Sequence, residues 1–153
     1  MRLFLDANVL FSAAHNPDGR AATLLAFAER GLCDLLTSPH AVEEARRNLD
    51  LKYPELAGRL PHILRKVAIC RESPPEGVTW ARTQGLPPRD APILAAAAEA
   101  RADLLVTGDR THFGALYGKK MRGAEIVTPA VALARLLSQL PGGGHVVFLP
   151  QES

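Results

Sequence analysis

Short apolar runs alternate with longer amphipathic segments along the whole chain. The short runs have the length of buried strands in a parallel sheet, and the longer segments repeat apolar residues at helical spacing. The predicted strands are residues 2–5, 33–37, 67–70, 104–106 and 126–127. The predicted helices are residues 21–30, 39–49, 53–66, 78–84, 91–101 and 130–140. Because strands that alternate with helices pair in parallel through right-handed crossovers, the sequence predicts a three-layer α/β/α domain with a central, mainly parallel sheet of about five strands.

Local signals define where several of these elements begin and end. The first strand ends at Asp6, where we expect the chain to enter a loop. Gly31 follows the helix 21–30, as glycine often does at a helix end. Ser38 and Pro39 are typical of an N-cap and a first helical position. Residues 73–77, rich in proline and glycine, indicate a loop.

Composition limits the domain organisation and the location of the protein. A chain of 153 residues with 47% apolar residues suffices for one domain with one core. We expect that domain over residues 1–140, followed over 141–153 by a glycine-rich hinge and an apolar tail suited to a sheet edge or a dimer contact. Cys33 and Cys70 lack metal-ligand spacing and indicate free thiols. With neither a membrane-length apolar run nor a secretory cleavage site, the sequence predicts a cytoplasmic protein and no membrane partner.

The net charge of +2 is too small to indicate nucleic acid by itself. A local basic rim is the remaining electrostatic hypothesis. Its members would be Arg46, Arg47, Arg65, Lys66, Arg110, Lys119, Lys120 and Arg122.

Three aspartates are expected to meet at one edge of the sheet. Asp6 and Asp109 follow predicted strands, and ligand sites of open α/β sheets form at the carboxyl ends of their strands. Asp90 begins the helix that leads into the strand 104–106, so it belongs to the same edge. Asp103 precedes that strand and lies about 13 Å from its far end, at about 3.3 Å per residue, which excludes it from this site.

Carboxylates held close together repel one another unless a cation compensates their charge. Their hard oxygens suit Mg²⁺ or Mn²⁺. Such an ion activates water and stabilises charge on phosphate, so the pattern predicts phosphodiester hydrolysis without a protein nucleophile.

Simpler interpretations exist for each acid taken alone. Asp90 is also a suitable helix cap, and Asp109 a suitable turn residue after Gly108. Glu43 and Glu44 both flank the apolar stripe of their helix, and periodicity does not choose between them.

Four motifs in combination resemble the PIN-domain family, and the resemblance extends through about Pro129. They are LFLDANVLFSA at residues 3–13, SPHAVEEA at 38–45, RDAPILAAA at 89–97 and ADLLVTGD at 102–109. The resemblance implies a ribonuclease that uses Mg²⁺ or Mn²⁺ held by four acids. It also implies RNA as substrate, a homodimer and, as in many bacterial and archaeal members, a toxin inhibited by an antitoxin protein.

Carried over residue by residue, the resemblance assigns both catalysis and metal binding to Asp6, Glu44, Asp90 and Asp109, and so favours Glu44 over Glu43. Asn8 and Thr107 match positions that support the acids or the metal-bound water. The chain departs from the family after Asp109, where a further acid is common but Arg110, Thr111, His112 and Phe113 stand here. This departure puts a second metal position in doubt. His112 is a candidate for assisting a Mn²⁺ site or contacting phosphate, against the simpler interpretation that a lone surface histidine is more often incidental.

Two rival functions fit parts of the same pattern. The D-x-N-x-L start is similar to that of aspartyl-phosphate phosphatases, but Asn8 cannot supply the proton that their second acid gives. A catalytically inactive PIN-like module that binds RNA or protein is the other alternative, and the complete acid set argues against it.

Overall fold

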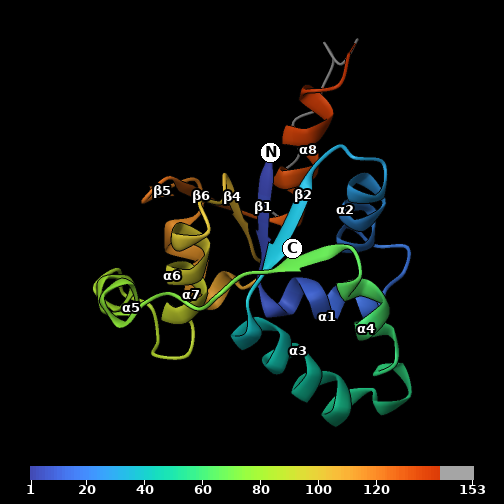
Figure 1. Ribbon diagram of the computed structural model, residues 1–153, viewed down its shortest axis with the longest axis horizontal. Coiled ribbons are helices and arrows are strands. Elements are labelled where there is room, and N and C mark those ends of the chain that lie inside the picture. Colours follow the sequence, from blue (N-terminus) through green and yellow to red (C-terminus); the bar gives the residue numbers. More distant parts are fainter. Residues whose placement is uncertain (142–153) are drawn as a thin grey trace.

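The computed structural model describes residues 1–141, and these form a central sheet with helices on both sides (Figure 1). The sheet has six strands in the order β3-β2-β1-β4-β6-β5. The first five of these pair in parallel, and only β5 runs antiparallel to its neighbour β6. The strands are β1 (Arg2–Leu5), β2 (Asp34–Thr37), β3 (Val67–Ile69), β4 (Leu104–Val106), β5 (Lys120–Met121) and β6 (Ala124–Val127). The predicted α/β class with a mainly parallel sheet is therefore confirmed.

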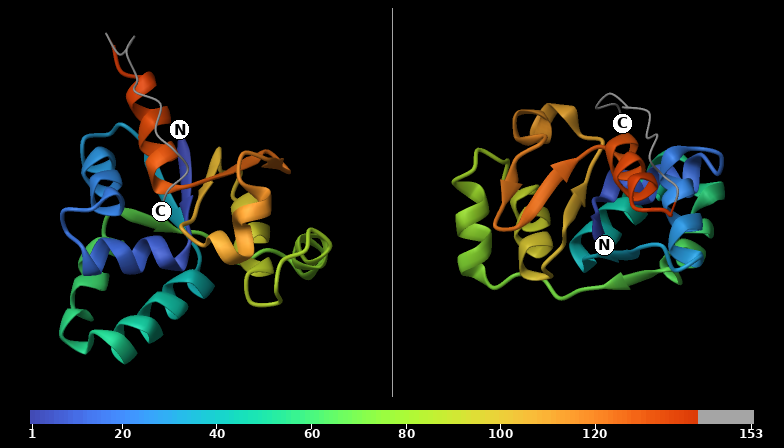
Figure 2. Two further views of the ribbon diagram at one scale, coloured as in Figure 1. Left: turned by 180° about the vertical axis from the view of Figure 1, so that it is seen from behind. Right: turned by 90° about the horizontal axis from the view of Figure 1, so that it is seen from above.

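Eight α-helices surround this sheet in the described part of the chain. Figures 1 and 2 show α5 and α6 on one side of the sheet and α2 and α8 on the other, while α1 and α3 continue beyond the carboxyl ends of β1 and β2. The helices are α1 (Ala7–His15), α2 (Arg20–Glu29), α3 (Pro39–Lys52), α4 (Arg59–Leu64), α5 (Pro75–Arg82), α6 (Ala91–Glu99), α7 (Arg110–Phe113) and α8 (Pro129–Ser138). Two 3-10 turns, Pro54–Leu56 and Gly114–Leu116, complete the set.

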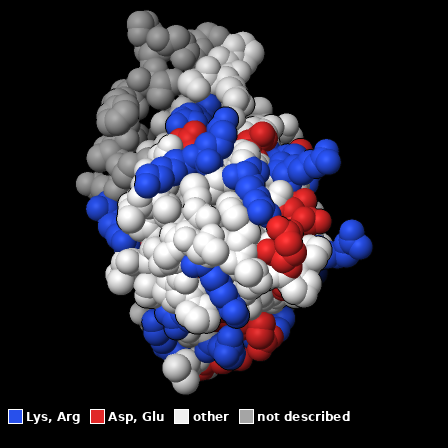
Figure 3. Space-filling view, turned by 90° about the vertical axis from the view of Figure 1, so that its left-hand side faces the viewer, with Lys and Arg blue, Asp and Glu red and all other residues white. Residues whose placement is uncertain are grey.

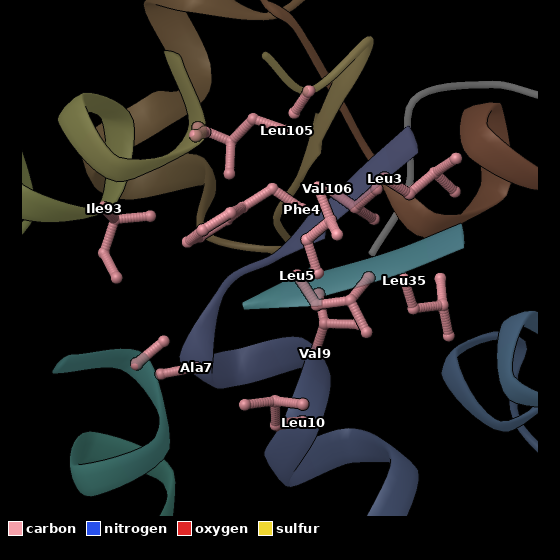
Figure 4. Close-up of a cluster of buried hydrophobic side chains, with 14 of the residues drawn as sticks. Leu3, Phe4, Leu5, Ala7, Val9, Leu10, Leu35, Ile93, Leu105 and Val106 are labelled. Carbon is pink, nitrogen blue, oxygen red and sulfur yellow. The ribbon is translucent and has the colours of Figure 1, made fainter. Parts of the chain in front are cut away.

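The core lies around β1, the central strand of the sheet. Leu3, Phe4 and Leu5 are 0–1% exposed because helices cover both faces of this strand. Figure 4 shows these side chains packed with Leu105 of β4 and Leu10 of α1. A strand buried on both faces reads as a continuous apolar run, which is why this one was predicted correctly.

Several predicted boundaries are confirmed together with their local causes. Gly31 follows α2 with a φ of +73°, a conformation that favours glycine. The hydroxyl of Ser38 accepts a hydrogen bond from the backbone N–H of Ala41 at 3.3 Å, and Pro39 begins α3. Ser38 is thus the N-cap that the sequence indicated.

The loop expected after Asp6 is wrong, because α1 begins at Ala7 and runs to His15. Its buried residues Val9, Leu10, Ala13 and Ala14 have helical spacing. Asp6 is the N-cap of this helix and accepts a hydrogen bond from the backbone N–H of Ala7. The sequence indicated a loop because the change from strand to helix falls on this single residue.

Three further predictions need correction. The helix expected over 53–66 is interrupted, since Pro54 opens a 3-10 turn and α4 begins only at Arg59. Helix α5 begins at Pro75, inside the segment assigned to a loop. The sheet has a sixth strand, β5, joined to β6 by a two-residue turn at Arg122 and Gly123, both with positive φ.

The glycine-rich hinge and apolar tail expected over 141–153 lie outside the described residues, apart from Pro141. None of the helices in residues 1–141 is long and apolar enough to cross a bilayer.

Candidate metal centre

The strand order changes direction at β1, and this creates the position of the candidate site. The chain builds outward from β1 through β2 to β3, then returns to place β4 on the other side of β1. Ligand sites of open α/β sheets form at such a switch point, beyond the carboxyl ends of the strands. Asp6 directly follows β1, and its backbone N–H donates a 3.0 Å hydrogen bond to the carbonyl of Val106 at the end of β4. The ends of the two strands are therefore joined beneath the site.

Asp6 is buried, with 3% exposure, and both of its carboxylate oxygens accept hydrogen bonds. Oδ1 accepts from the backbone N–H of Ala7 at 2.6 Å. Oδ2 accepts from the Thr107 hydroxyl at 2.8 Å and from the Asn8 amide at 3.0 Å. Asn8 also accepts from the backbone N–H of Gly108 at 2.8 Å, which ties α1 to the loop after β4. Asn8 and Thr107 thus fix the orientation of Asp6.

Asp109 begins the short helix α7 and holds His112 at the site. Its Oδ1 accepts from the backbone N–H of His112 at 3.0 Å, and its Oδ2 lies 2.7 Å from His112 Nδ1. Asp109 was considered as a turn residue, whereas the structure makes it the N-cap of α7. This cap uses Oδ1 and leaves Oδ2 beside an imidazole. The backbone N–H of Asp109 donates to the Thr107 hydroxyl at 3.1 Å, so Thr107 links this acid with Asp6.

Asp90 stands at the start of α6, yet its side chain makes no capping hydrogen bond. The cap interpretation does not explain it. Asp90 is 4% exposed, and its buried Oδ2 has no hydrogen-bond partner. His112 Nδ1 lies 3.2 Å from this oxygen, but without the alignment of a hydrogen bond, which it makes with Asp109 instead. A buried carboxylate oxygen without a partner is costly, and a cation is the group that would satisfy it.

Glu44 lies on the wall of the same pocket, and Glu43 does not. The pocket has a volume of about 390 Å³, and its lining residues include all four acids that the sequence proposed. Glu43 is exposed and pairs with Arg46 at 2.6 Å, three residues along α3. The structure therefore brings Asp6, Glu44, Asp90 and Asp109 together.

Three polar or charged pocket residues were missed by the sequence analysis: Ser12, Asn48 and Arg89. Ser12 lies one helical turn after Asn8 on α1, and Asn48 one turn after Glu44 on α3. The spacing of four residues indicates Asn48 on the predicted helix 39–49, whereas Ser12 could be found only if α1 had been predicted. Arg89 was named only as the residue before Asp90, and it adds a positive charge to an otherwise acidic wall.

Burial and mutual repulsion raise the pKa of two of these acids. Desolvation raises the pKa of Asp6 to about 6, against the hydrogen bonds from Thr107 and Ala7, and the charges of Glu44 and Asp90 add to the rise. Burial also raises the pKa of Asp90, opposed chiefly by His112 and reinforced by Asp109. The site thus holds carboxylates that are costly to ionise together.

A divalent cation fits this donor set. Ligand atoms of Asp90, Asp109 and His112 all lie within 4.8 Å of one another, next to the buried oxygen of Asp90 that lacks a partner. Carboxylate oxygens and an imidazole nitrogen are ordinary ligands of divalent metals. These three side chains are therefore the residues that would hold a divalent ion.

Among the other charged groups, the exclusion of Asp103 is confirmed and the hypothesis of a basic rim is weakened. Asp103, excluded from the site, accepts a 2.7 Å hydrogen bond from the backbone N–H of Arg2, at the amino end of the sheet. The hypothesis of a basic rim loses three members to ion pairs, because Arg46, Lys66 and Arg122 pair with Glu43, Glu29 and Glu76. On the face seen in Figure 3, Lys and Arg are likewise interspersed with Asp and Glu.

A parallel α/β domain with an acidic pocket at its switch point is the class that fold and site define. Residues 2–111 match the family model described as PIN domain. The chain therefore belongs to the PIN-domain family. No curated protein sequence matches it.

Solved structures of similar fold include proteins from bacteria and an archaeon. VapBC2 from Rickettsia felis, bound to a DNA fragment from its promoter, aligns with a TM-score of 0.61 and 18% identity, covering 84% of this chain and 98% of the other. A protein from Pyrobaculum aerophilum aligns with a TM-score of 0.63 and 23% identity, covering 91% of this chain and 100% of the other. VapC20 from Mycobacterium tuberculosis, a toxin that cleaves the sarcin–ricin loop, aligns with a TM-score of 0.56 and 15% identity. This alignment covers 74% of this chain and 94% of the other. At these identities the likeness establishes the fold.

Proposed function

We propose that the protein is a divalent-metal-dependent endoribonuclease, with Mg²⁺ or Mn²⁺ as cofactor, that hydrolyses RNA phosphodiester bonds at the pocket of Asp6, Glu44, Asp90 and Asp109. The observation that carries this proposal is the buried Oδ2 of Asp90, which has no hydrogen-bond partner among the described residues although Asp90 lies in a cluster with Asp109 and His112. Membership of the PIN-domain family supports a nuclease.

The residues of the chain have distinct parts in the proposed reaction. Asp90 and Asp109 would hold the ion, while Asp6 and Glu44 complete the negative wall of the pocket. When bound, the ion lowers the pKa of water and stabilises charge on the phosphate. Asn8 and Thr107 keep the Asp6 carboxylate in one orientation. Arg89, on the same wall, is suited to contact a phosphate oxygen of the substrate.

We further propose that the protein is the toxin of a toxin–antitoxin pair. Similar folds include VapC20, named as a toxin that cleaves the sarcin–ricin loop, and VapBC2, bound to a DNA fragment from its promoter. An antitoxin partner, a homodimer and a cytoplasmic location stay predictions.

Gel analysis of an RNA panel tests the activity. Wild-type protein is incubated with RNA in Mg²⁺, in Mn²⁺ and in EDTA, beside the variants Asp109→Asn and Asp103→Asn. Asp103 is the matched control, because it is an aspartate at the opposite end of β4.

Metal-dependent cutting by wild type and Asp103→Asn, but not by Asp109→Asn, is the expected result. Equal cutting by all three proteins would place the activity elsewhere or in a contaminant. Metal-independent RNA binding without cutting would favour the inactive binding module.

A further inference from the structure

His112 occupies the position in the acidic cluster that matters most for the kind of ion bound. Its Nδ1 lies 2.7 Å from Asp109 Oδ2 and 3.2 Å from Asp90 Oδ2, so it stands between the two carboxylates. One ring nitrogen carries at most one proton, and only its contact with Asp109 has the geometry of a hydrogen bond. The hydrogen bond goes to Asp109, and Asp90 Oδ2 is left buried without a partner. Without an ion, the three groups do not satisfy one another.

The two distances from His112 Nδ1 suit neighbouring ligands of one ion. Neighbouring ligands of an octahedral ion with bonds of about 2.1 Å lie about 3 Å apart. The two separations from His112 Nδ1 lie on either side of this value. An ion here would accept electron pairs from Nδ1 and from both carboxylates, and the imidazole proton would then reside on Nε2.

The side chain of His112 can reach such an ion without rearrangement of the fold. Its position is set by α7, where the backbone N–H of His112 is held by the capping Oδ1 of Asp109. The side chain is 30% exposed, so a bound ion would still be open to solvent and to a substrate on one side.

We propose that His112 is a direct metal ligand, and that the centre of Asp90, Asp109 and His112 prefers a divalent transition-metal ion such as Mn²⁺ to Mg²⁺. Imidazole nitrogen is a softer donor than carboxylate oxygen and favours transition metals, whereas Mg²⁺ is bound almost entirely by oxygen. This inference deepens the proposed function and rests on its metal centre, but it does not depend on RNA being the substrate.

Electron spin-echo spectroscopy of the Mn²⁺-loaded protein, without RNA, tests the ligand directly, because it detects a ¹⁴N nucleus bonded to the ion. His112→Asn is the informative variant, since its amide can keep a hydrogen bond to Asp109 but is a poor metal ligand. His62→Asn on the exposed side of α4 is the matched control. His112→Gln serves as a second variant should the first fail to fold.

The expected result is a ¹⁴N coupling in wild type and His62→Asn that disappears in His112→Asn. In titrations, His112→Asn should lose at least about 10-fold in Mn²⁺ affinity and much less in Mg²⁺ affinity. His112→Asp, which restores an all-oxygen set, should lower the ratio of Mn²⁺ to Mg²⁺ affinity further.

Three outcomes would overturn the proposal: no ¹⁴N coupling in wild type, a coupling that persists in His112→Asn, or an equal loss of affinity for both ions. Failure to bind any divalent ion would also remove the metal dependence of the proposed function. If the ¹⁴N coupling is found but RNA stays intact, the ligand assignment stands and the proposed substrate falls.

Discussion

Thr107 shows how a single buried hydroxyl can control an acid at this site. It is fully buried, donates to Asp6 Oδ2 and accepts from the backbone N–H of Asp109. Its hydrogen bond opposes the rise in the pKa of Asp6 that burial causes. The hydroxyl therefore favours the ionised form of Asp6, the form that a cation attracts.

We expect Thr107→Val to weaken metal binding at neutral pH by about 10-fold. Valine has the same shape but cannot donate, so the pKa of Asp6 rises further, and a hydrogen bond to a charged group contributes about 1.5–3 kcal/mol. Isothermal titration with Mn²⁺ between pH 5 and 8 should show half-maximal affinity shifted to higher pH. Thr107→Ser keeps the hydroxyl and should stay near wild type. An unchanged pH profile in Thr107→Val would show that the hydroxyl does not control Asp6.

Pattern alone predicted a site residue only where the residue adjoins a strand end or the helix that leads into a strand. Asp6, Asp90 and Asp109 were expected at one edge because each adjoins a strand end or the helix that feeds a strand, and the structure places them there. Glu44 was separated from Glu43 only by the resemblance to a family, because both lie beside the apolar stripe of α3. Arg89 gave no signal, since a lone arginine on a loop has no periodicity to interpret.

At the scale of elements, Asn8 connects two segments that are about a hundred residues apart in sequence. Its Nδ2 donates to Asp6 and to Thr107, and its Oδ1 accepts from the backbone N–H of Gly108. The start of α1 and the loop after β4 are thereby held together. This contact fixes the position of Asp6, at the start of α1, relative to Asp109, which follows the loop after β4.

Asn8→Ala should lower the free energy of unfolding by about 1–3 kcal/mol and metal affinity by about 10- to 100-fold. The first effect follows because the N–H of Gly108 loses its acceptor, and the second because the acids lose a supporting contact. Urea denaturation and metal titration measure the two effects. Asn16→Ala, at the exposed C-terminal end of α1 and outside this pocket, is the control and should leave metal affinity unchanged. A loss of stability with full metal affinity would assign Asn8 a structural role only.

The two elements that the sequence missed have different physical causes. Helix α1 follows β1 with only Asp6 between them, and this aspartate, the N-cap of α1, was interpreted as the start of a loop. Strand β5 has two residues, too few for an alternating pattern, and its turn at Arg122 and Gly123 lacks the usual asparagine or aspartate. Elements with a full period of buried residues, such as α6 and β4, were predicted.

At the scale of the whole molecule, the acidic pocket opposes folding when no cation is present. Asp6 has an ordinary pKa of 3.8 in an unfolded chain and a pKa of about 6 in the folded protein. The folded state therefore binds this proton more tightly, and stability falls as the pH rises from about 4 through about 6. The gap between the two pKa values corresponds to about 3 kcal/mol at neutral pH. A bound divalent cation would reverse this loss, because it stabilises the ionised carboxylates.

The free energy of unfolding of wild type relative to Asp6→Asn, measured by urea denaturation in EDTA, should thus fall by about 2–3 kcal/mol between pH 4 and pH 7. The difference between the two proteins cancels the titration of groups far from the site. Saturating Mn²⁺ at pH 7 should stabilise wild type and have a much smaller effect on Asp6→Asn. Asp103→Asn, at the other end of the sheet, keeps Asp6 and should match wild type both in the pH dependence and in the stabilisation by Mn²⁺. If the difference in the free energy of unfolding between wild type and Asp6→Asn is the same at pH 4 and pH 7, burial does not raise the pKa of Asp6. In that case Asp6 does not destabilise the metal-free protein, and an ion held by Asp90, Asp109 and His112 would not relieve a cost of ionising Asp6.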